Sequence, residues 1–308
     1  MMRFLTSLIL VLVAAAQEVS PPVAKVVPKR LEAHGDVRVD DYYWLRERDN
    51  PDVLAYLEAE NAYLEAVMKH TEGLQEQLFQ EIKGRIKKDD STVPYAYDGY
   101  YYFTRVEADK EYKIYCRKKG SLDAREEILV DANELAEGYE YFSIRGVRVS
   151  SGRDKLVFGV DTVGRRFYEL RFKNLTTGAM YDDVISHVTP NVAWANDNKT
   201  LFYTKQDPET LRWNRIFRHE LGTPVARDEL VYEENDETFS SFVFKTRSRK
   251  YIIIGSAHTL SSEYRFVDAD RPAGEFTVIE PRERDHEYGL TSTTSSISAR
   301  TGMPRTSV

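Results

Sequence analysis

The sequence predicts a mainly β fold in which a helical hairpin precedes a long region of short strands. The spacing of apolar residues is helical over residues 50–88 and becomes alternating from Val93 nearly to the end. Groups of a turn and an apolar strand then recur at intervals of about 40 to 50 residues, which is typical of β-propeller blades. With 308 residues, 42% of them hydrophobic, the chain has enough material for a large core.

The N-terminus has the composition of a secretory signal peptide. Arg3 precedes an apolar run over residues 4–13, and Ala14 to Ala16 then form a small-residue cleavage site. We expect a signal peptide over residues 1–16, cleavage after Ala16, and an exported protein, periplasmic or secreted. The apolar run is shorter than the roughly 20 residues of a membrane helix, so no stable membrane span is expected. Three prolines over residues 17–33 predict an extended linker.

Residues 34–88 are predicted to form a helical extension. Asn50 suits a helix N-cap, Pro51 suits the first turn, and Asp52 complements the helix dipole. Two apolar stripes follow, one after the other, and are expected to dock on another surface: Val53, Leu54, Leu57, Leu64, Val67 and Met68, then Leu74, Leu78, Phe79, Ile82 and Ile86. Tyr42, Tyr43 and Trp44 are expected to bury their rings against the first helix.

Residues 89–290 are predicted to form the strand-rich region. The first strand of each repeat, with its turn, falls at residues 98–103, 152–158, 197–203 and 248–254, and a second strand falls at 112–117, 166–172, 215–219 and 262–268. Matched lysines at positions 155, 199 and 250 are separated by 44 and 51 residues, so the repeat is irregular. The pattern favours propeller blades and leaves a β-sandwich as the alternative. Cys116 is expected to be a buried small residue in a strand.

The sequence contains no recognisable catalytic constellation. The pentapeptide Gly-x-Ser-x-Gly is missing, and Ser256 and His258 lie in or just after an apolar strand run rather than on an elbow before a helix. His219 and Glu220 begin like a zinc-protease helix, but Thr223 occupies the place of the second histidine. We therefore assign no catalytic, cofactor-binding or metal-binding residue and expect no cofactor.

Charge patterning gives little indication of a partner. The formal net charge is −7, and no basic run interleaved with aromatic residues occurs, so a nucleic-acid partner is not expected. The acidic balance would mildly attract cationic peptides. Paired carboxylates are expected to lie on solvated turns: Asp40–Asp41, Asp182–Asp183 and Glu233–Glu234.

Several segments carry a family resemblance. Residues 34–63, and then in order 111–115, 129–133, 168–178, 192–197, 218–223, 230–234 and 285–288, resemble oligopeptidase B, the Lys/Arg-directed branch of the prolyl oligopeptidase family of serine peptidases. The resemblance implies a partial β-propeller of about four of seven blades. It also implies that the family's C-terminal α/β-hydrolase domain, which would be this chain's partner, is absent from this sequence. In a full-length form the substrates would be short basic peptides, hydrolysed after Lys or Arg.

Two functions remain open from the sequence. The first is the substrate-gating propeller part of such a serine endopeptidase, inactive by itself because it lacks the triad. The alternative is a free-standing exported propeller-like module that binds peptides or a protein. Residues 291–308 do not continue the resemblance, and we interpret them as a non-homologous, frameshifted tail, which favours the first function.

Overall fold

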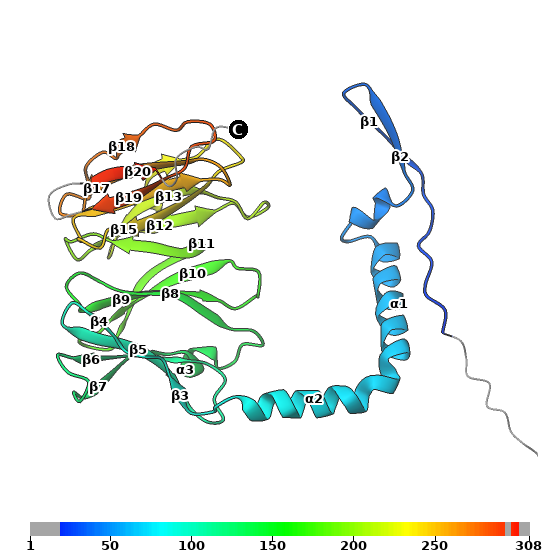
Figure 1. Ribbon diagram of the computed structural model, residues 1–308, viewed down its shortest axis with the longest axis horizontal. Coiled ribbons are helices and arrows are strands. Elements are labelled where there is room, and N and C mark those ends of the chain that lie inside the picture. The colour runs from blue at the N-terminus through cyan, green and yellow to red at the C-terminus, as the bar shows by residue number, and fades with distance from the viewer. Residues whose placement is uncertain (1–18, 293–296, 302–308) are drawn as a thin grey trace, which may run out of the picture. The chain divides into compact units, whose positions relative to one another are not determined.

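The computed structural model describes residues 19–292 and 297–301. The chain divides between Lys87 and Lys88 into two compact units, a smaller one at the N-terminus and a strand-rich one after it (Figure 1). The predicted signal peptide and most of the predicted tail lie outside the described residues.

The first unit opens with a hairpin of β1 (Lys29–Ala33) and β2 (Asp36–Asp40). His34 and Gly35 form its two-residue turn, both with positive φ (52° and 79°), as a tight hairpin turn requires. His34 is thus a turn residue. The linker expected to be extended up to residue 33 instead ends in a paired strand. That pairing was not predicted: Val37 and Val39 do alternate with polar residues in β2, but the run is only five residues long and β1 has no such alternation.

The predicted helices of this unit are confirmed. After the 3-10 turn η1 (Tyr43–Arg46) come α1 (Pro51–Met68), the short η2 (Lys69–Thr71) and α2 (Glu72–Arg85). The side-chain oxygen of Asn50 accepts from the backbone N–H of Asp52 at 2.9 Å, which caps α1 as expected.

Burial in this unit differs from the prediction for some aromatic residues. Trp44 is buried, and its Nε1 donates to the carbonyl of Lys25 at 2.8 Å. Tyr42 is 47% exposed, so its predicted burial was wrong. It lies at the turn before η1, where its backbone N–H is held by the carboxylate of Asp40 and its ring is left outside.

The second unit begins with a sheet in the order β3-β5-β6-β7, with β4 pairing to β5. Its members are β3 (Asp90–Ser91), β4 (Tyr95–Tyr97), β5 (Tyr100–Val106), β6 (Ile114–Lys119) and β7 (Glu126–Asp131), followed by α3 (Ala132–Ala136). Cys116 lies buried in β6 as a free thiol, as predicted. Burial raises the pKa of this thiol to about 12.

A seven-stranded antiparallel sheet follows, in which the strands β8 to β14 lie side by side in sequence order. Its members are β8 (Ser143–Val149), β9 (Lys155–Asp161), β10 (Tyr168–Asn174), β11 (Met180–Trp194), β12 (Thr200–Gln206), β13 (Trp213–Glu220) and β14 (Glu229–Glu233). The 3-10 turn η3 (Val225–Arg227) precedes β14.

The long strand β11 joins two blades within this sheet. Its first half pairs with β10, with Ile185 opposite Leu170, and its second half pairs with β12, with Val192 opposite Tyr203. A register shift lies between these halves, at Pro190, whose missing N–H cannot take part in a ladder. One strand therefore serves as the outer strand of one blade and the inner strand of the next.

A four-stranded sheet and a final hairpin complete the unit. The sheet consists of β15 (Ser240–Lys245), β16 (Tyr251–Ala257), β17 (Ser262–Asp268) and β18 (Thr277–Glu280), and the hairpin of β19 (Tyr288–Ser292) and β20 (Ile297–Thr301). Every strand expected from the four turn-and-strand repeats is present. The described part thus contains four blades, and β19 and β20 follow them.

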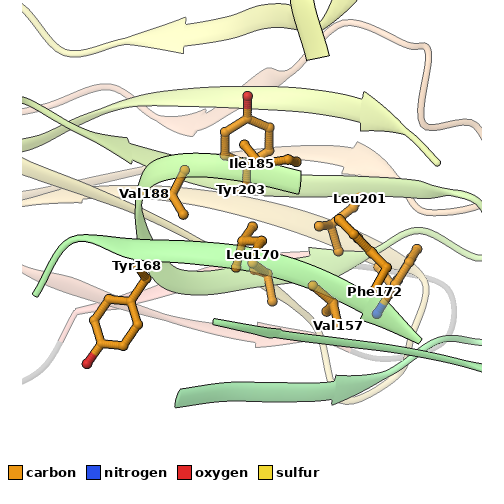
Figure 2. Close-up of a cluster of buried hydrophobic side chains, with 10 residues drawn as sticks. Val157, Tyr168, Leu170, Phe172, Ile185, Val188, Leu201 and Tyr203 are labelled. Atoms are coloured by element: carbon orange, nitrogen blue, oxygen red, sulfur yellow. The ribbon is translucent and has the colours of Figure 1, made fainter. Parts of the chain in front are cut away.

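Three hydrophobic cores hold successive blades face to face. The first joins β5, β7, β8 and β9 around Phe158, the second joins β9 to β12 around Phe172, and the third joins β11 to β13 with β15 to β17 around Phe202. Figure 2 shows the second core, with Phe172 of β10 beside Leu201 of β12. Each blade buries its faces against its neighbours, which is how propeller blades stack.

Candidate functional site

A cleft of about 1120 Å³ runs along the first strands of the four blades. Its walls come from β4, β8, the second half of β11 and β15, which include Tyr95, Arg148, Trp194 and Lys245. In the first blade, β5 and β6 also contribute to the lining. The indole N–H of Trp194 donates to the carbonyl of Arg148 at 3.2 Å, which ties β11 to β8. Aromatic and aliphatic side chains supply much of the wall, as is usual where proteins bind small molecules or peptides.

The walls of the cleft approach each other closely at Gly146. This residue has a φ of +63°, and a Cβ built on it would lie 2.3 Å from the carbonyl oxygen of Pro190. Only glycine fits there, both for its backbone conformation and for the space. The contact fixes the distance between β8 and β11 in the cleft.

The cleft is cationic although the chain is acidic. Six basic and two acidic side chains line it, a net charge of +4 against −7 for the whole sequence: Lys113, Arg145, Arg148, Arg153, Lys245 and Arg249, with Asp98 and Glu111. Within the described part of the chain, Arg145, Arg148 and Lys245 have no carboxylate in ion-pair distance. A field of this sign concentrates anionic groups in the cleft.

Turns of three blades converge on Asp98 beside the cleft. Arg153 Nη2 lies 2.7 Å from one carboxylate oxygen, and Arg249 Nη1 lies 2.6 Å from the other. The hydrogen bond from Arg153 and then that from Arg249 lower the pKa of Asp98, against the opposing effect of burial. Asp98, Arg153 and Arg249 all have positive φ, as does Asn198 in the remaining blade, so the four turns repeat one backbone geometry. We call Asp98, Arg153 and Arg249 the turn cluster.

Lys245 lies next to the turn cluster, in the wall of the cleft. Its Nζ donates to the hydroxyl of Ser151 at 2.8 Å, and that hydroxyl donates in turn to the carbonyl of Ala195. Burial, followed by the charge of Arg249, lowers the pKa of Lys245 to about 8, while the charges of Asp270, Asp197 and Asp98 oppose the shift.

Two asparagine side chains form hydrogen bonds between neighbouring blades around the cleft. Neither residue was predicted to be a site residue. Asn191 donates from Nδ2 to the carbonyl of Val243 at 3.0 Å and accepts from its N–H at 2.7 Å, so it acts as a substitute strand partner between β11 and β15. Asn198 accepts from the N–H of Gly152 and donates to Asp154. The only sequence signal for Asn198 was its place in a turn, and Asn191, inside β11, had none.

The serine and histidine considered in the sequence do not form a pair. The Oγ of Ser256 donates to Glu234, whereas Nδ1 of His258 accepts from the backbone N–H of Leu260 at 3.1 Å. The preceding Gly255 is required by packing, since a Cβ there would lie 2.4 Å from Cζ of Phe242.

Two of the carboxylates expected on solvated turns are instead buried. Asp183 accepts from the N–H of Gly222 at 2.7 Å and lies 3.1 Å from Nε2 of His219. Glu234 is 5% exposed and takes hydrogen bonds from Ser256, Tyr232 and Arg282. The prediction was wrong for these two residues because most of their donors, among them Gly222 for Asp183 and Arg282 for Glu234, lie far away in the sequence.

His219 lies fully buried between two carboxylates. Its Nδ1 is 2.7 Å from Asp228 Oδ1, on the far side from Asp183, so both ring nitrogens are occupied. Burial by itself would lower the pKa of His219, but the hydrogen bonds and charges of Asp228 and Asp183 outweigh it, and the pKa is raised.

These features define a class of protein, a β-propeller that encloses a cationic cleft along its inner strands. Residues 21–303 match the family model of the prolyl oligopeptidase N-terminal β-propeller domain. The chain is 42% identical over 293 residues to dipeptidyl aminopeptidase BI of Pseudoxanthomonas mexicana, covering 89% of this chain and 40% of that protein. It is 35% identical over 268 residues to Protease 2 of Moraxella lacunata, covering 85% of this chain and 39% of that protein.

Solved structures agree with the sequence comparisons. Oligopeptidase B from Leishmania major superposes with a TM-score of 0.80 at 29% identity, covering 89% of this chain and 41% of that one. Oligopeptidase B from Trypanosoma brucei gives 0.79 at 27% identity, with the same coverage. The chain belongs to the prolyl oligopeptidase family and corresponds to its N-terminal β-propeller domain. It spans about 40% of the length of these relatives. The propeller is therefore confirmed over the β-sandwich alternative.

Proposed function

We propose that this chain is the substrate-gating propeller part of an oligopeptidase B-like serine endopeptidase, which acts together with an α/β-hydrolase domain on short peptides after Lys or Arg. Membership of the prolyl oligopeptidase family supports the peptidase class. The relatives named Protease 2 and oligopeptidase B support the finer assignment.

The cleft along the inner strands is the observation that carries the proposal. Inner strands of a propeller surround its central channel, so the cleft occupies the position of such a channel. Its volume of about 1120 Å³ is close to that of a small-ligand pocket, so it suits an extended peptide and is far too small for a folded protein.

The helical unit supports the proposed partner. Apart from the buried Val53, the predicted stripe of α1 is exposed, with Leu57 at 51% and Leu64 at 58%, and α2 also exposes Phe79 and Ile82. Contiguous apolar side chains of this kind mark an interaction surface. We assign this surface to the hydrolase domain, which would be the surface on which both stripes are expected to dock.

A chimera tests the gating function. Residues 21–290 replace the matching segment of dipeptidyl aminopeptidase BI of Pseudoxanthomonas mexicana, and cleavage is followed on a short arginyl peptide and on a folded protein with the same site in a loop. We expect turnover of the peptide, blocked by a serine-directed inhibitor, while the folded protein stays intact. Equal cleavage of both substrates would contradict gating, and loss of all turnover in a folded chimera would contradict the pairing with a hydrolase domain.

Export remains part of the proposal. The N-terminal composition supports a cleaved signal peptide over residues 1–16. Among the described residues, no helix has the length and hydropathy that a membrane crossing demands. Mass spectrometry of the protein expressed in a bacterium should find Gln17 as the first residue, and a retained Met1 in the exported fraction would contradict cleavage.

A further inference from the structure

We propose that the part of the cleft beside the turn cluster, where Lys245 lies with Arg153 and Arg249, is a binding site for a carboxylate group of a peptide. The proposal rests on the proposed function in one respect, namely that the cleft receives peptides. It adds the chemical group that is recognised there and the residues that recognise it.

The first argument is the balance of charge at this place. Asp98 is ion-paired to both Arg153 and Arg249, so one negative charge is shared between two guanidinium groups. Lys245 adds a third positive charge beside them and has no ion-pair partner within the described residues. These four cleft-lining groups therefore keep a net charge of +2, while Asp197 and Asp270, whose charges also act on Lys245, do not line the cleft. An anion placed among the three cations would lower their mutual repulsion.

The second argument is the hydrogen-bonding capacity of Lys245. An ammonium group has three donors, and the bond to Ser151 uses one of them. The Ser151 hydroxyl donates its only proton to the carbonyl of Ala195, so its oxygen can only accept the hydrogen bond from the Lys245 ammonium group. This bond holds the ammonium group in place. Partial burial of an ammonium without a counter-ion costs free energy, which fits the lowered pKa of this lysine. A ligand carboxylate would supply both the missing charge and further acceptors.

The third argument distinguishes a peptide from an inorganic anion. The same cleft is lined by Tyr95 and Phe244, which add apolar surface to the wall that also carries the cations. Phosphate would use only the charges, whereas a peptide would use the charges and also bury its side chains on the aromatic walls. The proposed ligand is therefore amphipathic, with its carboxylate at the turn cluster.

This site would also orient the peptide. A Lys or Arg side chain is repelled by the three cations, so a basic residue would point away from the turn cluster while the carboxylate binds there. An overall attraction of cationic peptides by an acidic surface, as suggested by the net charge of −7, does not hold for this cleft, where the lining carries +4.

The test uses the full chain and fluorescence anisotropy with two labelled pentapeptides that differ only in a free or an amidated C-terminus. We expect the free acid to bind about tenfold or more tightly than the amide, as loss of a charge-assisted hydrogen bond predicts, and this difference to shrink in high salt. A third peptide, amidated but carrying a glutamate side chain, shows whether a side-chain carboxylate serves as well as the terminal one. Binding of it at the affinity of the free acid also supports the proposal.

Substitutions assign the effect to the site. Lys245→Met should abolish the preference for the acid, and Arg249→Asn should weaken it while suiting the left-handed φ of 63° at that position. The exposed Arg247, in the same turn but outside the cleft, provides the control Arg247→Met, which should keep the preference. Circular dichroism verifies folding, and if Lys245→Met fails to fold, the comparison of acid and amide on the unsubstituted chain decides.

Equal affinity for acid and amide, or binding of neither, would overturn this proposal and leave the outcome of the chimera experiment untouched. Inorganic phosphate that binds as tightly as the acid peptide, and displaces it at a concentration equal to the peptide's dissociation constant, would also overturn the proposal. The aromatic walls would then contribute nothing to the affinity. Loss of the preference in Arg247→Met would show that net charge, and not this site, is responsible.

Discussion

Buried polar residues are held in place in this propeller by partners from other strands. Burial raises the pKa of Glu234, but hydrogen bonds from Arg282, Ser256 and Tyr232 outweigh burial and lower this pKa to about 2. The carboxylate therefore stays ionised at any physiological pH, and it joins the end of β14 to β16 and to the segment after β18. Such a network is stabilising only while every member keeps its partners.

His219 allows a prediction at this scale, since its pKa in the folded chain lies above the ordinary value of 6.5. A raised pKa gives a stability contribution that is complete below pH 6.5 and is lost as the pH rises through the folded-state pKa. We expect the free energy of unfolding in urea to fall over this range. His219→Gln should remove that dependence and destabilise the unit by about 3–5 kcal/mol, because two buried carboxylates lose the cation between them and each keeps only a neutral donor, Gly222 N–H or Tyr203 O–H.

The matched control is His187→Asn. His187 is exposed and has a φ of 58°, which asparagine tolerates. This variant should keep both the stability and the pH dependence. A pH dependence that persists unchanged in His219→Gln would contradict the role assigned to His219.

At the scale of elements, local signals decide where each helix and hairpin begins. The capped start of α1 comes from three adjacent residues, Asn50 to Asp52, and the hairpin turn of β1 and β2 from His34 and Gly35. Each blade turn repeats a left-handed residue, and in two of the four turns it is Asp98 or Asn198, residue types that take up that conformation more readily than most. In the other two turns it is an arginine, which carries no such local signal. Asp109, between β5 and β6, also has a positive φ of 66°.

The N-cap provides a prediction for an element. Asn50→Ala removes the acceptor for the N–H of Asp52 and should cost about 1 kcal/mol of helix stability. Hydrogen exchange at the first turn of α1 should then be about fivefold faster, with α2 unaffected. Asn50→Asp keeps the acceptor and should exchange as the unsubstituted chain does. Equal rates for the alanine and aspartate variants would show that the cap contributes nothing.

At the scale of the whole molecule, stability depends on closure of the ring. A propeller protects its sheet edges and blade faces by closing, whereas the four blades of the described residues do not close a ring among themselves. The exposed stripes of α1 and α2 add to this, because burying each such side chain is worth about 1.5–3 kcal/mol.

The 308-residue chain by itself should show no serine-peptidase turnover on an arginyl fluorogenic peptide. It should also unfold at a lower temperature than the chimera with the hydrolase domain of its relative. The sequence lacks the nucleophile elbow that forms an acyl-enzyme, and a triad without its serine and histidine retains no such chemistry. Inhibitor-sensitive turnover, or a sharp transition of a soluble monomer at the temperature of the chimera, would contradict this prediction.

The sequence by itself determined the helical hairpin and the two strands at the centre of each blade repeat. The period of apolar residues, the cap at Asn50 and the blade turns act over a few residues, so they predicted the helical hairpin and the strands. The tertiary structure decided the rest. The pairing of Asp98 with Arg249, the burial of His219 between Asp183 and Asp228, and the cationic cleft all join residues far apart in the chain. No local sequence pattern predicts such contacts, because they form only when the blades pack against one another.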